Sequence, residues 1–186
     1  MRVLGISGSL RRGSFNSALL RAAGERLPGG AELVEFDRLA EIPLYDEDID
    51  VEPAPPAVAA LREAMREADA VLIATPEYNH SIPGVLKNAL DWASRPAGKS
   101  ALSGTPAAVI GASTGMFGAV WAQAETRKVL GAMGGRVLEA ELPVAHAREK
   151  LATGRLTVEP ELLERLDETL AELVSQAEVE SPLLAA

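Results

Sequence analysis

Short apolar segments alternate with helical patterns along most of this chain, and this alternation constrains the fold more than any other feature. Buried strands are predicted at residues 3–6, 31–36, 70–74 and 107–110, with a weaker one at residues 136–142. Apolar residues at helical spacing mark residues 19–27, 58–68, 85–90, 119–133 and 161–177, the last segment with Pro160 in its first turn. Such alternation predicts an α/β domain with a mostly parallel sheet and right-handed crossovers.

The size of the chain fits one domain of this class. At 186 residues with 47% hydrophobic side chains, it can bury one substantial core. Five strands covered by helices on both faces fit the doubly wound order 2-1-3-4-5 of the flavodoxin-like fold. We expect one domain over residues 1–178 and a flexible tail at residues 179–186. Ligands of such sheets bind where strands one and three end, so the loops after strands one, three and four are the candidate site.

Composition excludes several classes of function. A net charge of -9 disfavours an extended surface for nucleic acid or anionic membrane. The absence of cysteine excludes thiolate chemistry and disulfides, and two scattered histidines make a histidine metal centre improbable, so no metal site is predicted. The acidic run at residues 45–50 lacks the spacing of a calcium loop and is interpreted as a solvated connection. With neither a signal-peptide pattern nor a membrane-spanning apolar run, a cytoplasmic protein is expected.

The turn after the first strand has the features of an anion cradle. Gly8 and Gly13 allow the backbone to bend and approach a ligand, Ser9 and Ser14 offer hydroxyls, and Arg11 adds a planar positive fork. A helix that starts near Ser14 would aim unpaired N–H groups into the turn. The same residues could also form an ordinary turn in which Ser14 only caps the helix and Arg11 faces water.

The spacing of the glycines narrows the choice of anion. Gly8 and Gly13 are spaced as in a P-loop, but Ser14 stands where the P-loop lysine should be, which argues against a nucleoside triphosphate. The dinucleotide fingerprint G-x-G-x-x-G is also missing. A terminal phosphate monoester therefore remains the favoured ligand group.

Two more loops at the same predicted edge are richer in polar groups and glycines than a plain connection requires. In the loop at residues 75–81, Pro76 stiffens the turn, and residues 77–79 can offer consecutive backbone N–H groups to a planar heterocycle. His80 is interpreted as a solvated loop histidine. The loop at residues 111–118 combines hydroxyls with glycines, so that a flat ring could lie close to its backbone.

Three segments of this sequence resemble the NADPH-dependent FMN reductase family, which includes quinone, azo-dye and chromate reductases. They are Gly-Ser-Leu-Arg-Arg-Gly-Ser-Phe-Asn at residues 8–16, Pro-Glu-Tyr-Asn at residues 76–79 and Gly-Val-Leu-Lys-Asn-Ala-Leu-Asp-Trp at residues 84–92. The resemblance implies non-covalent FMN with its phosphate in the first turn and its ring beside the other two loops. The residues expected around FMN are Ser9, Arg11, Gly13, Ser14, Phe15, Asn16, Pro76, Glu77, Tyr78, Asn79, Ser113, Thr114 and Gly115.

The resemblance also implies an activity. Hydride would pass from NADPH or NADH to FMN and then to a small acceptor such as a quinone, flavin, azo compound or chromate, in two half-reactions at one site. No residue is assigned a catalytic role. Members of the family form homodimers or tetramers, and the segment with Val85, Leu86 and Trp92 would be the contact helix. The alternatives are a flavodoxin-type electron carrier that does not oxidise NAD(P)H itself and an enzyme acting on nucleotide phosphates.

Overall fold

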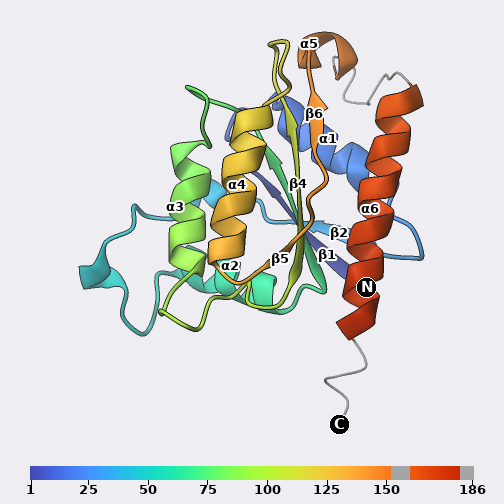
Figure 1. Cartoon of the computed structure of the whole chain (residues 1–186). Helices are drawn as coiled ribbons and strands as arrows, with labels where there is room; N and C mark the ends of the chain where they lie inside the picture. The colour runs from blue at the N-terminus through green and yellow to red at the C-terminus, as the bar shows by residue number, and fades with distance from the viewer. Residues whose placement is uncertain (152–159, 181–186) are drawn as a thin grey trace.

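The computed structural model describes residues 1–151 and 160–180 and contains one sheet with the order β2-β1-β3-β4-β5, in which β6 also pairs with β4. All strand pairs are parallel (Figure 1). The strands are β1 (Arg2–Ser7), β2 (Glu32–Glu35), β3 (Ala70–Thr75), β4 (Pro106–Ala112), β5 (Arg136–Val137) and β6 (Leu142–Val144). The predicted α/β class, parallel sheet and strand order are confirmed.

The last strand differs from the sequence-based prediction. We expected one strand over residues 136–142, but the start of β4 pairs with β5 and the end of β4 pairs with β6. Between the two strands the chain leaves the edge of the sheet, and Leu142 N–H donates to the side chain of Gln123 at 3.1 Å. Pro143, which has no N–H to donate, is tolerated because β6 is an edge strand.

Helices cover both faces of the sheet (Figure 1). They are α1 (Phe15–Gly24), α2 (Pro56–Arg66), α3 (Gly84–Ala93), α4 (Val120–Ala132), α5 (Ala147–Lys150) and α6 (Pro160–Glu180), with short 3-10 turns η1 (Leu39–Glu41) and η2 (Glu47–Ile49). Helices α1, α5 and α6 pack against one face through a core that includes Leu19 and Leu170. Helices α2, α3 and α4 pack against the other face through a core that includes Leu61, Leu90 and Leu130.

The C-terminal helix is longer than its apolar stripe predicts. The apolar stripe predicts a helix over residues 161–177, and α6 runs from Pro160 to Glu180. The expected tail at residues 179–186 therefore begins inside this helix, and residues 181–186 lie outside the described residues. No helix in the described ranges is both long and apolar enough to cross a membrane.

Candidate functional site

The loops that follow β1, β3 and β4 converge on one pocket of about 670 Å³. Parallel strands place these loops at the same edge of the sheet, which is why residues far apart in sequence meet here. The pocket is lined by Ser9, Arg11, Ser14, Phe15, Asn16, Pro76, Glu77, Tyr78, Ala112, Ser113, Thr114 and Arg148.

The turn after β1 presents hydrogen-bond donors to the pocket. Ser14 caps α1, because its hydroxyl oxygen accepts from Ser17 N–H at 3.2 Å and so leaves its own proton free to donate. The backbone N–H groups of Phe15 and Asn16, in the first turn of α1, meet no acceptor among the described residues. Arg11 is exposed and lies over the Phe15 ring, 4.7 Å from its centroid. Hydroxyl, backbone N–H and guanidinium donors together suit an anion at this end of the pocket.

Asn16 connects this turn to the end of β4. Its amide nitrogen donates to Ala112 C=O at 2.9 Å, and its side-chain oxygen accepts from Ala112 N–H at 2.9 Å. The side chain is buried, so both bonds are protected from water. Asn16 therefore fixes the distance between two walls of the pocket, a role that the sequence did not indicate.

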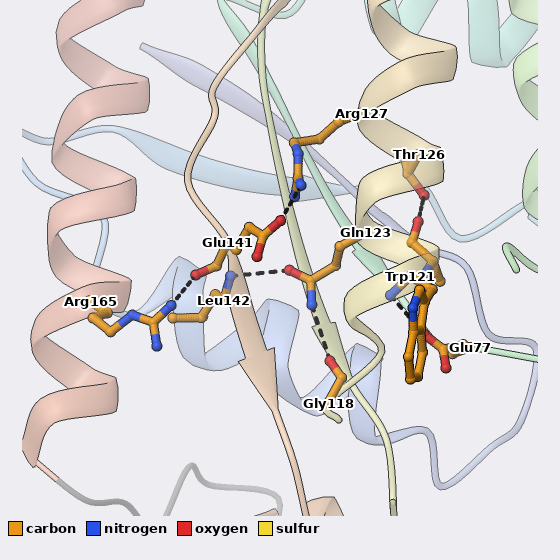
Figure 2. Close-up of polar contacts among 10 residues, drawn as sticks. Glu77, Gly118, Trp121, Gln123, Thr126, Arg127, Glu141, Leu142 and Arg165 are labelled. Atoms are coloured by element: carbon orange, nitrogen blue, oxygen red, sulfur yellow. Dashed lines mark hydrogen bonds and ion pairs between the residues drawn. The ribbon is translucent and has the colours of Figure 1, made fainter. Parts of the chain in front are cut away.

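Glu77 connects the loop after β3 to α4. One of its carboxylate oxygens accepts from the backbone N–H groups of Trp121 and Ala122, at 3.0 Å and 3.2 Å (Figure 2). Helix α4 begins at Val120, and the residue before it, Ala119, has left-handed φ and a side chain that cannot cap the helix, so Glu77 supplies the cap from another loop. The carboxylate is thus directed to the start of α4.

The loop after β4 is held by a second buried amide. Gln123 donates to Gly118 C=O and accepts from Leu142 N–H, both at 3.1 Å (Figure 2). Gly118 has φ +58°, and a Cβ there would lie 2.5 Å from the carbonyl carbon of Pro143. Only glycine fits this close approach without moving the backbone. The Gln123 amide therefore joins α4, the pocket loop and β6.

The rim of the pocket contains a tight turn. Tyr78 and Ser81 exchange backbone hydrogen bonds of 3.0 and 3.1 Å, and the two residues between them, Asn79 and His80, both have positive φ. These dihedral signs at both central positions are those of a type I′ turn. Asn79 is not among the residues that line the pocket. His80 packs edge-on against Trp121 at 4.6 Å between ring centroids.

The comparison with protein families decides the class of this site: residues 1–149 match the NADPH-dependent FMN reductase family. The chain belongs to this family. It is 54% identical over 130 residues to an NAD(P)H-dependent FMN reductase of Pseudomonas aeruginosa, a match that covers 70% of this chain and 69% of the relative. It is 44% identical over 129 residues to a 2-hydroxy-1,4-benzoquinone reductase of a Burkholderia species, covering 69% of each chain.

Solved structures agree with the family assignment. FerB of Paracoccus denitrificans, described as a flavoenzyme NAD(P)H:(acceptor) oxidoreductase, superposes with a TM-score of 0.82 at 35% identity and covers 95% of this chain and 97% of its own. A flavodoxin of Pseudomonas aeruginosa superposes with a TM-score of 0.56 at 17% identity, covers 96% of this chain and 99% of its own, and shares the fold alone. The predicted family, the FMN cofactor and the NAD(P)H-dependent oxidoreductase activity are confirmed.

Most of the residues that the sequence predicts around FMN line the pocket of this chain. The exceptions are Gly13, Asn79 and Gly115, which are not among the lining residues. Two lining residues were not predicted, Ala112 and Arg148. Ala112 is the last residue of β4, and its apolar side chain carries no signal for a site. Arg148 lies on α5, which follows the unexpected strand β6, so no pattern in the sequence places it at the pocket.

The helix expected to contact a second subunit, α3, buries one face in the core of the chain, while Lys87 and Asp91 on its other face are partly exposed. Leu86 and Trp92 are fully buried in the core, and the Trp92 indole N–H donates to Pro43 C=O at 2.8 Å. These two side chains are therefore not accessible to a second subunit, and the contact through this helix stays a prediction. Val85 is half-buried and packs against the same core.

Proposed function

We propose that this chain holds FMN non-covalently in the pocket and passes hydride equivalents from NADPH or NADH to a small quinone-type acceptor. The observation that carries the proposal is that a donor-rich, positively charged turn lines a pocket of about 670 Å³ at the carboxyl ends of β1, β3 and β4. The family match and the quinone-reducing relatives support the same activity. Free flavins, azo compounds and chromate are further candidate acceptors.

The phosphate of FMN would lie in the turn after β1. The hydroxyl of Ser9, the free proton of Ser14 and the N–H groups at the start of α1 are the neutral donors that would hold it. Arg11 supplies a charge, and its stacking on Phe15 limits the number of conformations that binding must restrict. In this proposal, Gly13 shapes the turn and makes no side-chain contact.

The flavin ring would lie against the other two loops. Pro76 is buried and gives a rigid apolar edge, and Ser113 and Thr114 form the opposite wall with polar groups. Asn79 and Gly115 would support these walls from outside the pocket lining. Tyr78 and Thr114 are exposed, so one side of the ring would be open to a nicotinamide and then to the acceptor.

Bound FMN supplies the hydride chemistry in this family, and the protein supplies position and electrostatics. Glu77 is occupied at the start of α4, and the side chain of Asn16 is occupied at Ala112. Both residues act by holding the loops in place. No residue is proposed to move a proton during the reaction.

A homodimer would complete the rim of the pocket. Four large side chains beside it are exposed: Tyr78, Met116, Phe117 and Trp121. Phe117 and Trp121 pack edge-on at 4.8 Å between centroids, so they form one apolar surface. We propose this surface as the contact between subunits, and light scattering of the purified protein tests dimer against monomer or tetramer. We propose the cytoplasm as the compartment because it supplies both NADPH and NADH.

Anaerobic reduction tests the activity and separates it from electron carriage. Addition of NADPH or NADH to the FMN-loaded protein should abolish the absorbance of oxidised flavin near 450 nm within seconds. Reduction by dithionite serves as the control that the bound flavin is reducible. A flavin that stays oxidised with both nicotinamides but accepts electrons from dithionite would overturn the proposal in favour of a carrier. Initial rates with quinones, free flavin, azo compounds and chromate would then rank the acceptors.

A further inference from the structure

Arg148 brings a second guanidinium group to the pocket. It lies on α5, is exposed, and lines the same pocket as Arg11. Neither arginine forms an ion pair with a carboxylate in the part of the chain that the structure describes. Arg62 and Arg127, by contrast, are paired with Asp50 and Glu141. An unpaired cation directed to a pocket is available for an anionic ligand.

A series of short contacts places Arg148 beside the turn after β1. Ala147 N–H donates to Ser113 C=O at 3.0 Å, and the residue before Ser113 is Ala112, which Asn16 binds from α1. Ala147 and Leu151 are buried in the same core as α1, on the same face of the sheet. Arg148 therefore lies on the α1 side of the pocket, near the end that carries Arg11.

The charge of the expected ligand group exceeds what Arg11 can balance. A phosphate monoester carries about -1.5 to -2 charges at neutral pH, and Arg11 contributes a single positive charge. The chain as a whole has a net charge of -9, so it offers no general attraction for an anion. A second cation at the pocket would balance the remaining negative charge of the phosphate.

We propose that Arg148 binds the terminal phosphate of FMN together with Arg11, so that the phosphate lies between guanidinium groups from two segments far apart in the sequence. This inference rests on the proposed function. The phosphate monoester that Arg148 recognises could also be the 2′-phosphate of NADPH. The FMN phosphate is favoured because Ala147, Ser113, Ala112 and Asn16 link Arg148 to the start of α1.

Flavin titration of the apoprotein tests the proposal without any turnover. We expect Arg148→Gln to weaken FMN binding about 3- to 10-fold, a range suited to an exposed charged contact, and to leave riboflavin binding unchanged. Raising the salt concentration should narrow the FMN difference, because exposed charges are screened. Arg148→Lys keeps the charge and should recover part of the loss. Arg66→Gln makes the same charge change at an exposed site on α2 and should leave both affinities unchanged.

The possible outcomes separate the roles of Arg148. Equal weakening of FMN and riboflavin would show that the substitution disturbs the pocket generally and would overturn the inference. Unchanged FMN affinity with a lowered preference for NADPH over NADH would assign Arg148 to the nicotinamide nucleotide and would also overturn it. Wild-type apoprotein that takes up neither flavin would overturn the proposed function itself. Circular dichroism of each variant confirms that the compared proteins are folded.

Discussion

Asn16 and Ala112, 96 residues apart in sequence, exchange two buried hydrogen bonds of 2.9 Å each. The contact joins the first turn of α1 to the last residue of β4, and both residues line the pocket. The distance between the turn after β1 and the loop after β4 therefore depends on one side chain. Removing it should affect both stability and ligand binding.

Asn16→Ala should lower the free energy of unfolding by about 2–4 kcal/mol, because Ala112 would keep a buried N–H and C=O without partners. Urea unfolding followed by circular dichroism measures the loss. Gln176→Ala is the control, since within residues 1–151 and 160–180 its side chain makes a single hydrogen bond, of 3.3 Å, to Glu172 on the same helix. A loss below about 0.5 kcal/mol in Asn16→Ala would show that water or a rearranged loop replaces the two bonds.

Glu77 provides a second test of long-range support. Glu77→Ala should cost about 1–2 kcal/mol, because α4 loses the acceptor for the N–H groups of Trp121 and Ala122. Glu77→Gln keeps an oxygen acceptor and loses only the charge at the helix start, so its cost should be smaller, about 0.3–1 kcal/mol. Thermal unfolding of the two variants shows which of them loses more stability. Equal losses would mean that charge, and not hydrogen bonding, accounts for the effect.

Two contacts of α6 with the rest of the chain allow the stabilisation by apolar burial to be compared with that by a surface ion pair. Leu170 is fully buried between α6 and the sheet, and Leu170→Ala should cost about 2–5 kcal/mol. Arg26 is paired with Asp167, and this hydrogen bond raises the pKa of Arg26, yet both side chains are more than one third exposed. Arg26→Ala should therefore cost less than about 1 kcal/mol. A folded pKa above the unfolded value means that the contribution is present at neutral pH and is lost only at strongly alkaline pH. Chemical unfolding of both variants at pH 7 gives the comparison, and a larger loss in Arg26→Ala would reverse the ranking.

Local patterns in the sequence predicted the elements that bury continuous apolar segments. Strands β1, β3 and β4 and the stripe of α6 were found because their periodicity is local and strong. The division of the last strand could not be predicted, because it depends on Gln123 taking the Leu142 N–H. Burial of Trp92 was also missed, since the same apolar pattern fits an internal helix and an interface helix.

The sequence predicted those hydrogen-bond donors of the candidate site that directly follow a strand. Ser9, Arg11 and Ser14 follow β1 directly and could be read from spacing. The capping role of Glu77 and the bridging role of Asn16 depend on partners 44 and 96 residues away, which no local pattern contains. Tertiary contacts thus decide whether a polar loop residue faces the ligand or supports the wall behind it.

Arg11 is the residue whose loss should affect flavin binding most directly. Arg11→Ala removes a charge-assisted contact to the phosphate and should weaken FMN binding by about 1.5–3 kcal/mol, or one to two powers of ten in affinity. Riboflavin lacks the phosphate, so its weaker binding should be unchanged by the substitution. Isothermal titration of apoprotein with both flavins measures the two effects. Arg12→Ala is the matched control, because Arg12 is the neighbouring exposed arginine and does not line the pocket. If Arg11→Ala and Arg12→Ala weakened FMN equally, the effect would come from the general charge of the turn, and the fixed position of Arg11 over Phe15 would have no part in recognition.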